Sequence, residues 1–185
     1  MNKKPNLFVV GVARAGTSSW HNYFKQHPDI FMSEEQRPNF FGEYDDVNRK
    51  YFDAEEKYLD LFKDVKNEKV IGESSHLFGS LNAPREIKKF NPNSKIIVIL
   101  RNPVDVLRSA IDSGGQITVK SLIFTFKELL YHDNLKRWIN AFGRKNIHVI
   151  IFDDYVKDTS KEYKKACDFL GIDNSFLISI RWLDE

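Results

Sequence analysis

The stretch LFVVGVARAGTSS, residues 7–19, decides the fold of this chain. Its first half, Leu7–Val12, is short, β-branched and almost continuously apolar, which is typical of a strand buried on both faces of a parallel sheet. Small residues follow, and Trp20 and Phe24 then recur at helical spacing. A strand, a small-residue loop and a helix N-terminus bring free backbone N–H groups and a favourable dipole together, so the segment predicts an anion-binding loop.

Three further apolar runs are similar to this first strand: Val70–Glu73, Ile96–Leu100 and Ile147–Phe152. Amphipathic segments alternate with them, and the clearest are residues 20–27, 51–62 and 122–142. Strands that alternate with helices indicate βαβ units, so we expect an α/β fold with three layers, α/β/α, and a mostly parallel sheet. In such a sheet ligands bind beyond the carboxyl ends of the strands, where we expect the functional residues to lie.

The composition indicates one ordinary globular domain over residues 1–185. Hydrophobic residues make up 42% of the chain and charged residues 29%, which excludes collagen-like, low-complexity and disordered classes. The net charge of +2 disfavours a nucleic-acid partner, and no apolar run approaches the ~18 residues that span a bilayer, so we expect no membrane partner. Cys167 has no second cysteine to pair with, so we expect a buried, inert thiol and a reduced, cytoplasmic setting.

The spacing of the two glycines in the loop indicates which class of anion the loop could bind. Gly11 and Gly16 stand five positions apart, as in the nucleotide-binding pattern GxxxxGK[ST], but Thr17 takes the place of the lysine. The positive charge comes earlier, from Arg14 inside the loop. This displaced cation disfavours a metal-dependent NTP-hydrolysing site. A plain strand–turn–helix, with Thr17 as the helix cap, is the simplest alternative.

A second basic motif, Arg101–Ser109, follows the strand Ile96–Leu100 directly. Asn102 is a good N-cap and Pro103 suits the first helical position, so we expect a helix to begin there. Arg101 then projects from the carboxyl end of its strand, beside the glycine loop if the two strands are neighbours. Because guanidinium groups donate to phosphate in a two-pronged geometry, Arg101 is a candidate phosphate ligand.

Together the two motifs resemble those of PAPS-dependent sulfotransferases, where PAPS is 3′-phosphoadenosine 5′-phosphosulfate. Ala13–Ser18 is similar to the 5′-phosphosulfate loop Pro-Lys-x-Gly-Thr-Thr, with Arg14 in the lysine position, and residues 101–109 are similar to the 3′-phosphate motif. The resemblance implies a P-loop-kinase-like sheet, PAPS as donor, PAP as product and no metal. It also implies that Arg101 and Ser109 bind the 3′-phosphate, and that the 5′-phosphosulfate is bound by Arg14, Ala15, Gly16, Thr17, Ser18 and Ser19.

Shorter matches extend the resemblance over nearly the whole chain. Residues 38–41 are similar to the Pro-x-Phe-Phe segment of the family, residues 71–75 to its Gly-Glu-x-Ser strand, and residues 169–171 to its final Phe-Leu-Gly. These matches are nearest to the bacterial and heparan-type branch. The resemblance therefore implies an enzyme that moves a sulfuryl group to a hydroxyl or amine of a small-molecule or carbohydrate acceptor, with Arg14 stabilising the leaving group.

Two departures from the family pattern concern the acceptor side. In the heparan-type branch Lys-Glu precedes Pro-x-Phe-Phe and the glutamate is the general base, but Gln36 and Arg37 stand here. We therefore expect another base, either Glu35 in the same loop or His76, because an ordinary histidine pKa of ~6.5 suits proton acceptance near neutral pH. The chain also ends soon after Gly171, so we expect the C-terminal part of the usual family domain to be missing or shortened.

Two alternatives remain open. A P-loop kinase or NTPase is one, since Val149–Asp153 fits the apolar strand and aspartate that support magnesium. The other is a non-catalytic module that binds PAP or another nucleotide. The loss of the Lys-Glu pair at Gln36 and Arg37 favours this second alternative.

Overall fold

The computed structural model of the chain describes residues 3–42, 54–112 and 118–180. Its centre is a five-stranded sheet in the order β2-β3-β1-β4-β5, and every neighbouring pair of strands is parallel. This confirms the expected α/β class with a parallel sheet. The strands are β1 (Leu7–Gly11), β2 (Ile30–Met32), β3 (Val70–Ser75), β4 (Lys95–Leu100) and β5 (Ile147–Ile151).

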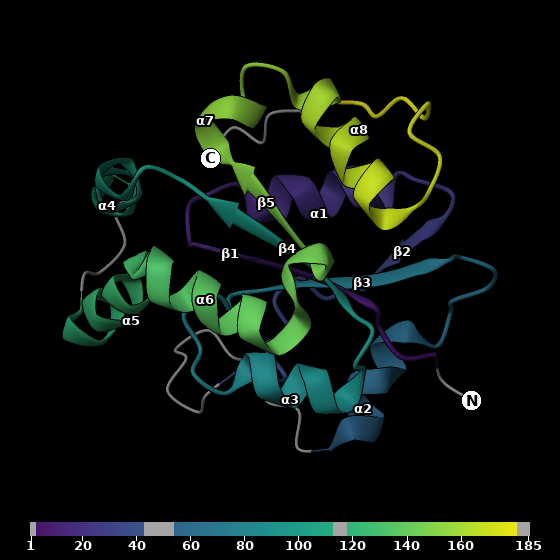
Figure 1. Cartoon of the computed structure of the whole chain (residues 1–185), viewed down its shortest axis with the longest axis horizontal. Coiled ribbons are helices and arrows are strands. Elements are labelled where there is room, and N and C mark those ends of the chain that lie inside the picture. The colour runs from purple at the N-terminus through teal and green to yellow at the C-terminus, as the bar shows by residue number, and fades with distance from the viewer. Residues whose placement is uncertain (1–2, 43–53, 113–117, 181–185) are drawn as a thin grey trace.

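Helices cover both faces of the sheet, so the predicted three layers are present (Figure 1). One outer layer holds α1 (Thr17–Lys25), α7 (Phe152–Tyr155) and α8 (Thr159–Leu170). The other holds α3 (Ala83–Phe90) and α6 (Tyr131–Phe142). The remaining helices are α2 (Glu55–Leu59), α4 (Pro103–Asp112) and α5 (Val119–Leu129), with short 3₁₀ turns at Asp60–Phe62 and Arg144–Asn146.

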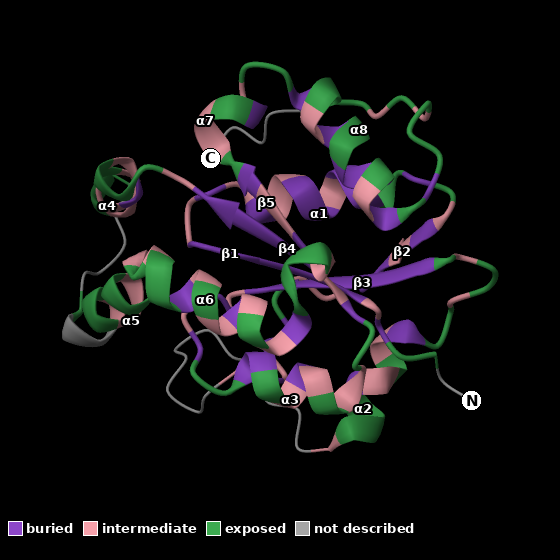
Figure 2. Cartoon of the chain, in the orientation of Figure 1, coloured by how far each residue is buried: buried purple, intermediate pink, exposed green. Residues whose placement is uncertain are grey.

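The apolar runs form the middle layer because side chains from both helical layers pack against them. All five residues of β1 are buried, and Figure 2 shows the strands as the buried centre of the molecule. Trp20 of α1 and Trp138 of α6 are both fully buried, and their helices lie on opposite faces of the sheet. The indole N–H of Trp138 donates to the carbonyl oxygen of Phe78 at 3.1 Å, so this large ring is buried without losing its hydrogen bond.

The structure differs from the sequence expectations in two elements. The three-residue strand β2 was not predicted, because so short a run carries no period of its own. The amphipathic segment 122–142 is two helices rather than one, since the backbone leaves the helical region at Leu130, where ψ is 61°. Residues 51–53, at the start of another expected helix, lie outside the described residues.

Cys167 is buried in α8, as the composition predicted. Burial raises the pKa of its thiol to about 11, so the group stays protonated near neutral pH and is a poor nucleophile. Among the described helices, none has both the length and the apolar character needed to cross a bilayer.

One ionisable group lies inside the sheet itself. Glu73 of β3 is fully buried, and this burial raises the pKa of its carboxyl to about 7. The Ser75 hydroxyl donates to Glu73 Oε2 at 2.8 Å and accepts from the Asn39 N–H at 3.0 Å. The Asn39 side chain in turn accepts from the backbone N–H of His76 at 2.9 Å. Glu73 therefore begins a hydrogen-bond chain that fixes the loop after β2 to the end of β3.

We predict that Glu73→Gln stabilises the protein increasingly as the pH rises. The native carboxyl holds its proton up to about pH 7 and the unfolded one only to its ordinary value of 4.5. Between these values the native state binds more protons, so unfolding free energy is lost as pH rises, by up to about 3 kcal/mol. Glutamine keeps a hydrogen-bond acceptor and carries no charge.

Urea unfolding of both proteins at pH 4.5–8 tests this prediction, with Glu56→Gln on exposed α2 as the control. The difference between Glu73→Gln and the unmodified protein should grow across this range. Parallel pH profiles for the two proteins would show that the buried carboxyl does not titrate there.

Candidate functional site

The strand order brings three loops to one edge of the sheet. β1 lies between β3 and β4, with Val10 opposite Ser75 and Gly11 opposite Ile99. The glycine loop after β1, His76 after β3 and Arg101 after β4 therefore share the carboxyl edge, at the left of Figure 1. The sequence predicted this convergence only on the condition that the strands were neighbours, and the register meets that condition.

The glycine loop has a conformation that depends on its small residues. Gly16 has a φ of 84° and forms the N-cap of α1, so Thr17 is the first helical residue and not the cap. A Cβ at Gly16 would lie 1.9 Å from the Tyr155 hydroxyl oxygen. A Cβ at Gly11 would lie 3.0 Å from both the Ile99 carbonyl oxygen and Thr17 Oγ1. Both glycines are therefore required by close approach of neighbouring groups.

Two hydrogen bonds join the motifs that the sequence analysis paired. Arg14 Nε donates to Ser109 Oγ at 3.0 Å, and Arg101 Nη1 donates to the Arg14 carbonyl oxygen at 2.7 Å. Asn102 Oδ1 accepts from the Val104 N–H at 2.9 Å, which confirms the predicted cap of α4. The residues expected to bind the two phosphate groups of one nucleotide are thus within hydrogen-bond distance of each other.

Arg101 is held firmly and retains donor capacity. Its carbonyl oxygen accepts from the Tyr131 hydroxyl at 2.6 Å, and its guanidinium carbon lies 4.2 Å from the centre of the Phe152 ring. Within the part of the chain that the structure describes, Arg101 Nε and the buried Thr17 Oγ1 have no hydrogen-bond partner. Unused donors on both motifs fit an anionic ligand with more than one phosphate group.

His76 lies at the edge expected of a general base, but its titration differs from the expectation. Burial, and then the positive charge of Arg37, lower the pKa of the His76 ring to about 4. The ordinary value assumed from the sequence is therefore wrong. The ring is neutral at pH 7 and is a weaker proton acceptor than an ordinary histidine. It faces Phe124 of α5, with 6.4 Å between the ring centres.

Glu35 lies on the far side of β3 from the glycine loop. Its loop runs beside β3, because the Ser33 N–H donates to the Gly72 carbonyl oxygen and the Arg37 N–H donates to the Ser74 carbonyl oxygen. The Ser33 hydroxyl donates to the Glu35 carbonyl oxygen at 2.8 Å. Glu35 and His76 both stay predictions as bases, and the structure places His76 one strand closer to the loop.

A carboxylate that the sequence analysis did not single out lies against the glycine loop. Glu128 of α5 is fully buried, and its Oε2 accepts from the Ala13 N–H at 2.8 Å. In an ordinary surface helix the apolar side chains are buried and the acidic ones are exposed. In α5 the pattern is reversed, because Ile123 and Phe126 are 51% and 57% exposed while Glu128 is buried. The sequence contained one indication that Glu128 is unusual: it is an acid in the last turn of a helix, where the helix dipole disfavours negative charge.

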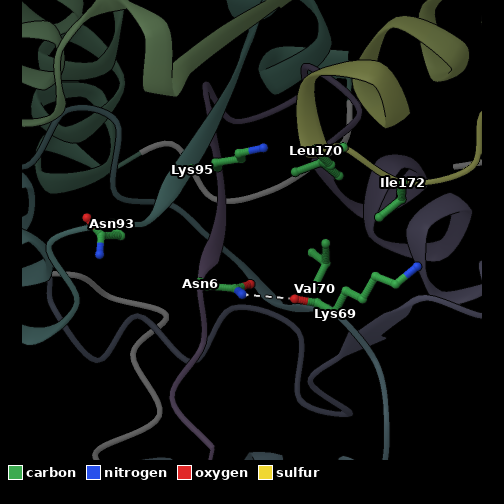
Figure 3. Close-up of a pocket in the computed structure, with 8 residues that line it drawn as sticks. Asn6, Lys69, Val70, Asn93, Lys95, Leu170 and Ile172 are labelled. Carbon is green, nitrogen blue, oxygen red and sulfur yellow. Dashed lines mark hydrogen bonds between the residues drawn. The ribbon is translucent and has the colours of Figure 1, made fainter.

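A small hollow at the opposite edge of the sheet is separate from this site. Figure 3 shows it at the amino ends of β1, β3 and β4, lined in part by Asn6, Lys69 and Lys95. Both lysines already have partners, since Lys69 Nζ contacts Asp29 at 3.1 Å and Lys95 Nζ donates to the Phe169 carbonyl oxygen at 2.6 Å. We therefore place the functional site at the carboxyl edge.

The parallel sheet, the glycine loop after β1 and the Arg101 motif after β4 define an α/β protein with a P-loop-kinase-like fold. Comparison with protein families makes this more specific, because the model described as the sulfotransferase domain matches residues 4–181. The chain belongs to the sulfotransferase family.

Individual relatives agree with this assignment. Human heparan sulfate glucosamine 3-O-sulfotransferase 6 is 25% identical over 91% of this chain and 52% of its own length. Mouse heparan sulfate glucosamine 3-O-sulfotransferase 3B1 is 23% identical over 91% of this chain and 46% of its own length. The chain spans about half the length of these curated relatives.

Solved structures show the same fold. A sulfotransferase from Alicyclobacillus acidocaldarius superposes with a TM-score of 0.84 at 26% identity, covering 99% of this chain and 87% of that one. A mouse sulfotransferase complexed with PAP superposes with a TM-score of 0.60 at 22% identity, covering 92% of this chain and 60% of that one.

We predict that Gly16→Ala destabilises the protein more than a matched glycine substitution. Gly16 and Gly171 are both in the left-handed αL region, with φ and ψ of 84° and 23° at Gly16 and of 75° and 37° at Gly171, so alanine costs similar backbone strain at both. At Gly171 the nearest atom to a new Cβ is Lys95 Nζ at 4.0 Å, whereas at Gly16 the new Cβ meets the Tyr155 hydroxyl. Gly16→Ala should therefore cost at least about 2 kcal/mol more unfolding free energy than Gly171→Ala.

Urea unfolding of the two variants measures this difference. Adding Tyr155→Phe to Gly16→Ala should recover part of the loss, since the next ring atom lies at 3.1 Å from the new Cβ. Equal losses for the two glycine variants would contradict the close packing of the loop against α7.

Proposed function

We propose that this protein transfers a sulfuryl group from PAPS to a hydroxyl or amine of a carbohydrate or small-molecule acceptor. The observation that carries the proposal is the junction of the two motifs through Arg14, Ser109 and Arg101. A nucleotide with phosphate groups at both its 5′ and 3′ positions matches two neighbouring cationic subsites. Membership of the sulfotransferase family supports the same reaction.

The residues of the loop would hold the 5′ end of the donor. PAPS supplies the sulfuryl group, whose transfer leaves negative charge on a phosphate oxygen. The backbone N–H groups of residues 16–19, at the N-terminus of α1, would donate to that end. The Arg14 guanidinium, which hydrogen-bonds to Ser109 in this structure, would exchange this bond for the charged oxygens of the 5′-phosphosulfate. Arg101 and Ser109 would hold the 3′-phosphate.

The names of the curated relatives bear on the acceptor. They describe sulfotransferases of glucosamine in heparan sulfate, so a carbohydrate hydroxyl or amine is the first acceptor class to test. His76 and Glu35 stay our candidates for its base. His76 lies nearer the loop, but its pKa of about 4 weakens its basicity.

The kinase alternative is less well supported by the site. Asp153 follows β5, and β4 separates β5 from the strand that carries the glycine loop. Thr17 also occupies the place of the phosphate-binding lysine.

We predict that PAP stabilises the protein more than ATP does, with or without magnesium. A ligand that binds only the native state raises its stability by mass action. At a concentration a hundredfold above Kd, PAP should raise the Tm by about 5 °C or more. Thermal melting with PAP, ADP and ATP, each with and without Mg²⁺, measures this. A larger shift with ATP and Mg²⁺ would favour the kinase alternative.

We predict different effects for the two arginines. Arg101→Ala should weaken PAP binding by about 2–3 kcal/mol, because a charged hydrogen bond to phosphate is lost. Arg14→Ala should act mainly on the transfer rate, because its charge is needed most as the leaving group develops.

Titration calorimetry with PAP and sulfuryl transfer to heparan sulfate oligosaccharides measure the two effects. Arg85→Ala, an exposed residue of α3, is the control for loss of one positive charge. An Arg101→Ala variant that keeps the PAP affinity of the unmodified protein would refute the 3′-phosphate assignment. A protein that binds PAP but transfers to no acceptor would favour the non-catalytic alternative.

A further inference from the structure

Glu128 has no part in the proposed transfer, yet it contacts the loop that would perform it. Its carboxylate is fully buried and accepts from the Ala13 N–H at 2.8 Å. Burial of a carboxylate is unfavourable unless hydrogen bonds or charges compensate for lost water. A buried carboxylate beside an anion-binding loop is also electrostatically unfavourable for an incoming anion. Because both effects are unfavourable, we looked for a role that would account for a carboxyl group at this position.

The scaffold, rather than the loop, fixes the backbone of Glu128. The Asn134 side chain on α6 donates to the carbonyl oxygens of Lys127 and Glu128, at 2.7 and 3.3 Å. Arg137 Nη1 donates to Asn134 Oδ1 at 2.9 Å and so orients that amide. On the other side Gly79, just beyond β3, packs so closely that a Cβ there would lie 3.0 Å from Glu128 N. The end of α5 is thus held between α6 and the turn after β3.

The group that Glu128 holds is the residue before Arg14. Arg14 has a φ of 65°, a left-handed conformation that residues with side chains rarely adopt. Hydrogen bonds hold this strained segment on both sides: Glu128 accepts from the Ala13 N–H, and Arg101 donates to the Arg14 carbonyl oxygen. The direction of the Arg14 side chain follows from this backbone, and its Nε reaches Ser109.

We propose that Glu128 is a positioning residue for the sulfuryl transfer, acting through Ala13 to hold Arg14 in its left-handed conformation. The inference rests on the proposed function for its catalytic consequence. It requires a hydrogen-bond acceptor at position 128 and does not require the negative charge. Glutamine at position 128 should therefore preserve the function. Methionine, which has a similar volume but only a weakly accepting thioether to offer the Ala13 N–H, should not.

The first test needs neither nucleotide nor acceptor. Hydrogen exchange of the Ala13 amide, followed by NMR in the free protein, should be at least about tenfold faster in Glu128→Met than in Glu128→Gln. Asp133→Asn, which removes an exposed acid from α6, is the control and should leave this amide unchanged. Equal exchange in the Met and Gln variants would overturn the proposal. If Glu128→Met does not fold, Glu128→Ala takes its place in the same comparison.

The second test asks whether Glu128 acts through Arg14. In the unmodified background Glu128→Met should lower the PAPS turnover number about tenfold, measured with heparan sulfate oligosaccharides, and lower PAP affinity by less. In the Arg14→Ala background the same change should lower turnover less than about twofold, because the group being positioned is absent. Equal losses in both backgrounds would refute positioning of Arg14.

Glu128→Gln separates the proposal from two rival roles. Turnover within about threefold of the unmodified protein supports positioning, whereas a loss of tenfold or more would show that the carboxylate charge is needed and would overturn it. Markedly tighter PAP binding would instead make Glu128 a competitor for the loop and would also overturn it. If the unmodified protein transfers to no acceptor, the proposed function fails, while the Ala13 exchange still decides the role of Glu128.

Discussion

The hydrogen bond from the Arg101 guanidinium to the Arg14 carbonyl oxygen is the contact on which the rest of the site depends. It links the end of β4 to the loop after β1, so the order of the strands determines where that loop can lie. It also stabilises a left-handed residue that is not glycine. Tyr131 of α6 and Phe152 of α7 hold Arg101 itself, so helices from both outer layers contribute to the shape of one loop.

Local signals made most of the glycine loop and the Arg101 motif predictable from the sequence. The apolar runs, the glycine spacing and the cap at Asn102 each act within a few residues, and the structure has all of them. The missed features depend on distant partners. The helix break at Leu130 has no proline or glycine to mark it, and Glu128 is buried by contacts with α6 and Gly79 that no local pattern encodes.

Protonation states were the least predictable property, because they depend on burial. A sequence supplies only ordinary pKa values, yet burial favours whichever form of a group is neutral. It therefore lowers the pKa of His76 to about 4 and raises that of Glu73 to about 7, although the two residues are close neighbours at the end of β3. Both groups are therefore largely or partly neutral near pH 7, and neither adds a full charge to this edge of the sheet.

One residue, Arg37, affects the proposed acceptor side in two ways. Arg37 stands where the heparan-type pattern has its glutamate, so a proton acceptor is absent from that position. Its charge also adds to the effect of burial in lowering the pKa of His76. The Arg37 N–H donates to the Ser74 carbonyl oxygen, which holds this residue beside the end of β3. Because a positive charge stabilises the deprotonated form of a hydroxyl bound nearby, Arg37 would also lower the basicity that the proposed transfer needs from another residue.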